Sequence, residues 1–306
     1  MNPAGLFFAT VAIWGTTWIV IKLQLAATAP EMGVALRFTV AAVVVLAWCM
    51  ARRIPLTLPR HVHLLLAGTG LLGFCISYFF VYHAERFIVS GLVAVGYSAA
   101  PLINMLLARL LLGTRMAARV ALGGLLGVVG IALVFWPEFS RLQAGGPLLI
   151  GASLTAGAVL ASCVSNIGMA RVQAAGIRGW APLGVAMAWG ALLSWLAILV
   201  TGTSTAVHWS PLFVLSLAWL SLAGSVIAFA AYYALLGKVG PARASYVGVM
   251  STLVALVISS IFEGYDWRLA TFIGIALAVG GNILALQGGS AARPLAAARP
   301  AAASAR

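Results

Sequence analysis

Apolar residues in this chain form long runs, separated by short stretches that contain proline, glycine, arginine or glutamate. A helix needs about 20 mostly apolar residues to cross the hydrocarbon core of a bilayer. Ten runs reach this length, and we expect each to form a membrane-spanning helix. They are residues 5–24, 31–50, 63–82, 87–111, 119–137, 147–170, 180–201, 211–235, 241–262 and 269–287.

The composition agrees with a membrane protein. Of the 306 residues, 63% are hydrophobic and only 8% are charged, and the mean hydropathy is +1.09. A soluble protein of this size could not bury so much apolar surface. The net charge of +13 does not indicate a nucleic-acid partner, because the basic residues are scattered singly between apolar runs. We therefore expect membrane lipids around the protein and no nucleic acid.

The chain carries no sign of a cleaved leader, a disulfide or a metal site. Its first apolar run lacks a basic n-region and an A-x-A cleavage site, so we expect a retained helix. Cys49, Cys75 and Cys163 lie inside apolar runs without CxxC or Cys/His spacing, which is typical of small core residues. We expect no metal and no cofactor. Residues 289–306, rich in Ala, Pro and Arg, are expected to form a disordered basic tail.

The basic residues predict the orientation. If the amino terminus is cytoplasmic, 13 of the 18 Lys and Arg residues fall on the cytoplasmic side and 4 on the outer side. All five acidic residues then fall on the outer side. Lys and Arg are enriched in cytoplasmic loops, so we expect both termini in the cytoplasm.

Two passages of the chain resemble each other. Residues 87–137 and 238–288 match at an offset of 151 positions. The match includes pairs of glycines in an apolar run, Gly123 and Gly130 in the first passage and Gly274 and Gly281 in the second.

This internal match predicts a fold of two halves, residues 5–137 and 147–287, with five spans each. An odd number of spans turns the second half upside down relative to the first. Inverted repeats of this kind place the site between the halves and provide the geometric basis of alternating access.

The first run contains Trp14-Gly15-Thr16-Thr17-Trp18, followed by Lys22. Gly15 allows a ligand or a backbone to approach closely. We interpret Trp14 as an aromatic wall of a cavity, with Thr17 beside it. The alternative is packing through Gly15, with Trp18 in lipid and Lys22 reaching the outer interface.

Arg37 is the only basic residue well inside a run. A charge within the membrane is costly and normally faces the bundle interior or water. Arg37 either binds a substrate carboxylate or is paired permanently, with Glu85 or with carbonyls at a helix end.

Polar and aromatic residues gather at the outer end of the third run. Tyr78 and Tyr82 are candidate cavity walls, and His83 and Glu85 could relay protons, since His titrates near neutral pH. The alternative is an interfacial aromatic belt with solvated charges.

The fourth and ninth runs carry small and polar residues at corresponding depths, and Pro101 frees a backbone carbonyl in the fourth. Such a paired interruption points to a site at the membrane midplane; a proline kink with helix packing is the alternative. The candidate residues are Tyr97, Ser98, Pro101 and Asn104 in the fourth run and Tyr246, Ser251 and Thr252 in the ninth.

The polar inventory is completed by Ser162, Ser165 and Asn166 in the sixth run and by Tyr232 and Tyr233 in the eighth, of which Ser165 and Tyr232 join the candidate substrate site. The alternative is hydrogen bonding between helices without a ligand. No Asp or Glu falls at the expected midplane, which argues against a cationic substrate and favours a zwitterionic, anionic or neutral one. No HExxH, paired Asp or GxSxG motif lies at membrane depth, so we do not expect an enzyme.

Several motifs, taken in order, resemble the EamA-type transporters of the drug/metabolite transporter superfamily, over residues 5–287. They are Trp14-Gly15 with Trp18 and Lys22, Leu36-Arg37-Phe38, Ala84-Glu85 through Pro101, Leu111-Leu112-Gly113-Thr114-Arg115, and Phe262-Glu263-Gly264-Tyr265-Asp266-Trp267. Thr114 replaces the usual acidic residue. The second half lacks a clear counterpart to Trp14-Gly15 and to Arg37, so we expect an asymmetric cavity.

The resemblance implies an all-α membrane fold of ten helices in two inverted repeats, enclosing a central cavity. It implies a secondary transporter or facilitator for a small-molecule substrate in a bacterial inner membrane, as a monomer or homodimer. We expect it to export amino acids or related zwitterions. A lipid-carrier or lipid flippase and a multidrug exporter are the alternatives.

Overall fold

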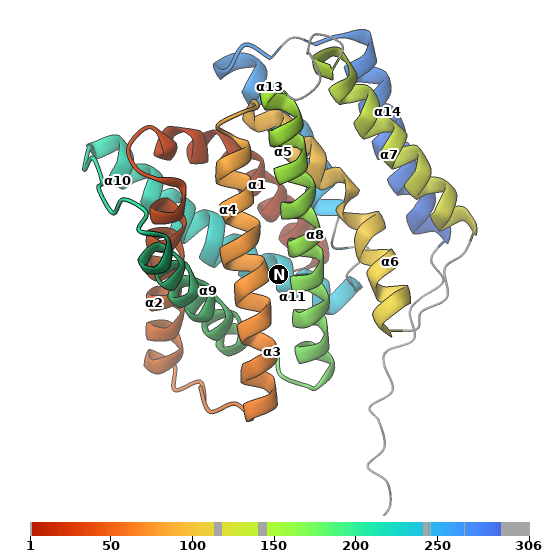
Figure 1. The fold of residues 1–306 in the computed structure, drawn as a ribbon. Helices are drawn as coiled ribbons and strands as arrows, with labels where there is room; N and C mark the ends of the chain where they lie inside the picture. The colour runs from red at the N-terminus through yellow and green to blue at the C-terminus, as the bar shows by residue number, and fades with distance from the viewer. Residues whose placement is uncertain are drawn as a thin grey trace, which may run out of the picture.

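The computed structural model describes residues 2–112, 118–139, 146–240, 244, 246–265 and 267–288. These residues are helical apart from short connections, and their one β-pairing is an isolated bridge between Thr28 and Val207. The expected basic tail and Thr114 lie outside the described residues. Figure 1 shows the helical bundle.

The helices of the first half coincide with the first five apolar runs. They are α1 (Pro3–Leu25), α2 (Pro30–Ala51), α3 (Arg60–Gly70), the π-helix η1 (Leu71–Ile76), α4 (Ser77–Ala84), α5 (Ser90–Gly96), the 3-10 turn η2 (Tyr97–Ala99), α6 (Ala100–Leu112) and α7 (Ala118–Phe139). Pro3 and Pro30 occupy the first positions of α1 and α2, where the missing N–H has no helical partner to lose.

The helices of the second half coincide with the last five runs. They are α8 (Pro147–Ala174), α9 (Trp180–Thr201), α10 (Pro211–Ala218), the π-helix η3 (Trp219–Ile227), α11 (Ala228–Val239), α13 (Tyr246–Phe262) and α14 (Leu269–Gly288). Pro147 and Pro211 open α8 and α10 in the same way.

Seven helices of the described part are long and apolar enough to cross a membrane. They are Pro3–Leu25, Pro30–Ala51, Arg60–Ala84, Ser90–Leu111, Pro147–Ala174, Trp180–Thr201 and Pro211–Val239. Three shorter apolar helices, Leu122–Trp136, Tyr246–Phe262 and Leu269–Gly281, accompany them. The all-α membrane fold is confirmed, and ten crossings with both termini cytoplasmic stay a prediction.

Two long helices contain π-helical turns at related places. The turn η1 ends at Ile76 and η3 ends at Ile227, which are 151 positions apart. The fourth run also has its expected interruption, the 3-10 turn η2, just before Pro101. The ninth run is continuous α-helix from Tyr246, because the counterpart of Pro101 is Thr252, whose hydroxyl bonds back to the Gly248 carbonyl within the helix.

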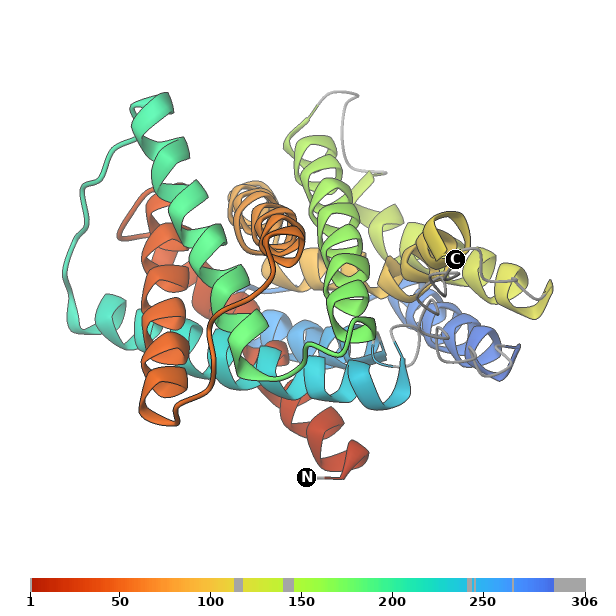
Figure 2. The same ribbon diagram turned by 90° about the horizontal axis from the view of Figure 1, so that it is seen from below.

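The helices pack in a pattern that repeats between the two halves. Helix α1, which opens the first half, packs against α11 and α13, whereas α8, which opens the second half, packs against α3, α4 and α6. Helix α2 lies along α9, and α7 lies along α14. Figure 1 shows α7 and α14 side by side, and Figure 2 shows the bundle from below.

The contact between α7 and α14 depends on glycines. A Cβ atom added to Gly274 would lie 2.5 Å from the carbonyl oxygen of Gly130, and one added to Gly281 would overlap the carbonyl of Gly123. These are the four glycines that match between the two passages of sequence. The repeat pairs Gly123 with Gly274 and Gly130 with Gly281, so it converts the contact of Gly274 with Gly130 into the contact of Gly123 with Gly281. This exchange is expected for a pseudo-two-fold axis between two antiparallel helices.

We expect Gly274→Ala to destabilise the protein by about 1 to 3 kcal/mol, the usual cost of overpacking. The matched control is Gly280→Ala on the same helix, where the added Cβ meets nothing within 4 Å. Thermal unfolding of both variants in detergent measures the effect. Equal stability of the two variants would show that the glycine contact is not tight.

Candidate functional site

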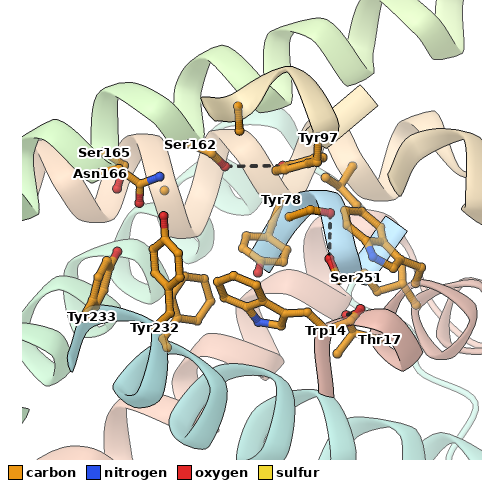
Figure 3. Close-up of a pocket in the computed structure, with 17 residues that line it drawn as sticks. Trp14, Thr17, Tyr78, Tyr97, Ser162, Ser165, Asn166, Tyr232, Tyr233 and Ser251 are labelled. Atoms are coloured by element: carbon orange, nitrogen blue, oxygen red, sulfur yellow. Dashed lines mark hydrogen bonds between the residues drawn. The ribbon is translucent and has the colours of Figure 1, made fainter. Parts of the chain in front are cut away.

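A cavity of about 830 Å³, counting its open mouth, lies between helices of both halves. Figure 3 shows its lining. The lining residues are Trp14, Thr17, Trp18 and Ile21 from α1; Gly73, Tyr78 and Val81 from η1 and α4; Tyr97 and Ala100 from η2 and α6; Ser162, Ser165 and Asn166 from α8; Phe229, Tyr232 and Tyr233 from α11; and Gly248 and Ser251 from α13.

Aromatic rings form most of the walls. The ring centroid of Trp14 lies 5.0 Å from those of Phe229 and Tyr232, and Trp18 lies 5.2 Å from Tyr97. The indole N–H of Trp14 donates to the carbonyl of Gly224 in η3 at 3.1 Å. The walls of the cavity therefore depend on contacts between α1 of the first half and the helices η3 and α11 of the second half.

Hydroxyl groups provide polarity on one wall. Ser77 Oγ lies 3.0 Å from the Tyr97 hydroxyl and 2.7 Å from Ser162 Oγ, and it donates to the carbonyl of Ala158 at 3.0 Å. Asn166 lines the cavity on the same helix as Ser162 and has no hydrogen bond to the described residues. A bound molecule can use this amide without breaking an existing bond.

The described lining contains no Asp, Glu, Lys, Arg or His. The polar groups at the cavity are hydroxyls, one amide and the edges of aromatic rings. An uncharged, low-dielectric cavity is unfavourable for an isolated ion and suits a molecule whose charges are absent or balanced.

Arg37 lies behind the cavity wall rather than in it. It is 1% exposed, its Nε donates to Ser225 Oγ at 2.9 Å, and its guanidinium lies 4.5 Å from the ring centroid of Tyr78. Ser225 in turn donates to the carbonyl of Leu220 in η3. Tyr78 stands between Arg37 and the cavity, so in this conformation the arginine supports the wall of the cavity and the π-helical turn.

The structure places the predicted site residues in two groups. Trp14, Thr17, Tyr78, Tyr97, Ser165, Tyr232 and Ser251 line the cavity. Gly15, Arg37, Tyr82, Ser98, Pro101, Asn104, Tyr246 and Thr252 do not. Of these, Gly15 packs on Val254, Tyr82 donates to Gln24, and Ser98 lies 3.2 Å from Thr252 beside a smaller cleft.

Some lining residues were not expected in the site. Trp18, placed in lipid by one interpretation of the sequence, lines the cavity instead. The signal was its spacing, because positions four apart lie on the same face of a helix. Phe229 was not expected either. Ser162, Asn166 and Tyr233, which belong to the polar inventory of the sixth and eighth runs, also line the cavity, but nothing in the sequence shows which of these neighbours face inward.

His83 and Glu85, the two residues that could relay protons, have different surroundings, and the relay stays a prediction. His83 Nε2 lies 2.7 Å from Glu31, and Lys22 Nζ lies 2.8 Å from Glu263. Glu85 is buried near these groups, but no hydrogen bond to His83 forms.

The sequence comparisons agree with this geometry. Residues 2–136 match the EamA-like transporter family. The inner membrane transporter YedA of Escherichia coli K12 is 28% identical over 262 residues, which is 84% of this chain and 81% of YedA, and its function is uncharacterized. YedA of Escherichia coli O157:H7 matches to the same extent.

A crystal structure of another protein superposes with a TM-score of 0.66 at 21% identity, covering 94% of this chain and 97% of that one. This likeness concerns the fold alone. The match over residues 2–136, the likeness to an inner membrane transporter and the seven long apolar helices together indicate a membrane transporter, and the expected inner-membrane location is confirmed.

We expect Arg37→Ala to lower the free energy of unfolding by about 2 to 4 kcal/mol, because it removes a buried charged hydrogen bond and a cation–π contact. Thermal unfolding in detergent measures this, with exposed Arg86→Ala as the matched control. Unchanged stability together with lost transport would instead assign Arg37 to the substrate.

Proposed function

We propose that this transporter exports small neutral or zwitterionic metabolites, amino acids first among them, by alternating access of one central cavity. The observation that carries the proposal is the uncharged, aromatic cavity lined by both halves of the chain. A zwitterion brings no net charge into the cavity, and its apolar part packs against the rings of Trp14, Tyr97 and Tyr232.

The mechanism requires two halves, residues 5–137 and 147–287, in inverted orientation with both termini in the cytoplasm. The repeated packing of α1 and α8, the paired turns η1 and η3, and the reciprocal glycine contacts of α7 and α14 support this arrangement. In such a fold the two halves exchange conformations, and the cavity opens to each side in turn.

The ligand site of the proposal comprises the lining residues Trp14, Thr17, Tyr78, Tyr97, Ser165, Tyr232 and Ser251, with Asn166 as an additional hydrogen-bonding group. A multidrug exporter is the second candidate, since aromatic rings also attract apolar organic cations through their faces. The absence of a carboxylate from the described lining favours the zwitterion.

A thermal-shift screen of the purified protein against amino acids, their analogues and tetraphenylphosphonium tests the proposal, followed by liposome flux of each hit. We expect amino acids to stabilise the protein and to exchange across the liposome membrane. Stabilisation by tetraphenylphosphonium alone would favour the multidrug exporter, and flux that persists without a proton gradient would show facilitation.

We expect Trp14→Ala to weaken binding of a hit at least about tenfold, or about 1.4 kcal/mol. The matched control is Trp136→Ala, because Trp136 is 64% exposed on α7, away from the cavity. Asn166→Leu should weaken binding with little change in stability, because Asn166 has no hydrogen bond to lose among the described residues. Full affinity in both site variants would contradict this location of the site.

A further inference from the structure

The cavity is sealed toward one end of the bundle. Ile21 and Val81 line it there, and each is only 2% exposed. One helical turn further along α1, the hydroxyl of Tyr82 donates to Gln24 Oε1 at 2.7 Å, and neither side chain is exposed. The distribution of basic residues assigns this end to the outer side.

An ion pair closes the same end. Lys22 Nζ on α1 lies 2.8 Å from Oε1 of Glu263, which directly follows α13. The carboxylate also accepts bonds from the N–H and the hydroxyl of Ser90, at the start of α5, and from the Ser259 hydroxyl at 2.7 Å. These four residues, which we call the latch, fasten α1, α5 and α13 together.

The lysine and the hydrogen-bond donors around Glu263 favour the ionised form of its carboxyl group. Burial raises the pKa of Glu263, but the bonds from Lys22, Ser90 and Ser259 together lower it below its ordinary value. The side chain of Lys22 is 37% exposed, so one edge of the latch is not covered by protein.

A second carboxyl group lies beside the latch without a partner. Glu85 directly follows α4 and is 1% exposed, and neither of its oxygens has a hydrogen bond in the described part of the chain. Burial, together with the charge of Glu263, raises the pKa of Glu85 well above its ordinary value, although Lys22 and Arg37 oppose the shift. An unpaired buried carboxylate is far more costly than the neutral acid, so Glu85 holds a proton in this conformation.

Charged and titratable groups from several elements surround Glu85. Lys22 lies on α1, Arg37 on α2 and Glu263 after α13, and Tyr82 lies on the same helix as Glu85. The nearby pair of His83 and Glu31 is satisfied within itself. The titratable groups of α8 bond elsewhere, Cys163 and Arg171 to carbonyls of α6. Glu85 and Glu263 thus both lie near Lys22, but of the two only Glu263 forms an ion pair with it.

We propose that Glu85 is a proton-binding site that controls the outer latch: a proton on Glu85 holds the latch closed, and its release to the outer solution favours opening. This inference rests on the proposed function, because it assumes that the outer end opens during transport. When the end opens, water hydrates the carboxylate of Glu85 and removes the cost of ionising it.

The direction of the pH effect follows from linkage. The pKa of Glu85 is raised in the closed conformation and returns toward the ordinary value of about 4.3 once hydrated. The proton therefore stabilises the closed conformation fully below the ordinary pKa, and this stabilisation is lost as the pH rises through the raised pKa. Between the two values, the ratio of open to closed protein rises up to about tenfold per pH unit.

The test measures the distance across the latch directly. Spin labels are attached at Ala26→Cys and Phe262→Cys, both exposed and at the ends of α1 and α13, with Cys49, Cys75 and Cys163 replaced by alanine. Pulsed electron–electron distance measurements in lipid nanodiscs then cover pH 5.5 to 8.5. We expect one short distance at acid pH and a longer distance whose population grows as the pH rises.

Glu85→Gln mimics the protonated acid and should keep the short distance at every pH. Glu31→Gln is the matched control at the same end, and its pH response should equal that of the parent protein. A parent protein whose distances do not change with pH would overturn the proposal, whether or not the Glu85→Gln variant folds. An unchanged pH response in Glu85→Gln would overturn it too.

These distances are measured without a substrate, so the two proposals can fail separately. Liposome flux without a pH response in the latch removes the role of Glu85 and leaves the transport function standing. A pH response without flux of any screened compound removes the proposed substrate class and supports the proton site.

Discussion

In a lipid environment, a carbonyl group that leaves the helical hydrogen-bond ladder needs another donor, because no water is available to replace it. The π-helical turn η3 shows how this chain meets that constraint. The Gly224 carbonyl accepts the indole N–H of Trp14, and the Leu220 carbonyl accepts the hydroxyl of Ser225, which also holds Arg37. The guanidinium of Arg37 in turn packs on the ring of Tyr78. Three helices of the first half are therefore positioned by one irregular turn of the second.

The same network explains why the cavity is uncharged although a cation lies beside it. The guanidinium of Arg37 donates a hydrogen bond to Ser225 and packs on the face of Tyr78, and the ring of Tyr78 separates it from the cavity. The remaining charges of the described helices gather at the helix ends, where Lys22 meets Glu263 and His83 meets Glu31. Charge at the ends and neutral groups in the middle keep the cost of desolvation low while leaving polar groups for a ligand.

The two halves are related but not equivalent around the cavity. The glycine contacts of α7 and α14 are reciprocal, whereas the bond from Arg37 on α2 to Ser225 in η3 has no counterpart at the related turn η1 among the described residues. In the second half, Trp189 roughly corresponds to Arg37, and it packs near Gly70 where α9 meets α3. The two halves therefore contribute different groups to the hydrogen bonds around the cavity. The first half contributes the guanidinium of Arg37 and the indole N–H of Trp14, and the second contributes the Ser225 hydroxyl and the Gly224 carbonyl that accept their hydrogen bonds.

The sequence by itself determined where the helices lie and that they belong in a membrane, because the length and apolarity of a run are local properties that need no partner. It also indicated Trp14, Tyr97 and Tyr232 as inward-facing aromatics, and the structure places all three in the cavity lining. The sequence could not decide between Trp18 in lipid and Trp18 in the cavity, or between Glu85 and Ser225 as the partner of Arg37. Those choices depend on which helix faces meet, and the partners lie far apart in the chain, 188 positions for Arg37 and Ser225. In an almost uniformly apolar chain the hydrophobic pattern does not distinguish lipid from protein interior, so only tertiary packing decided them.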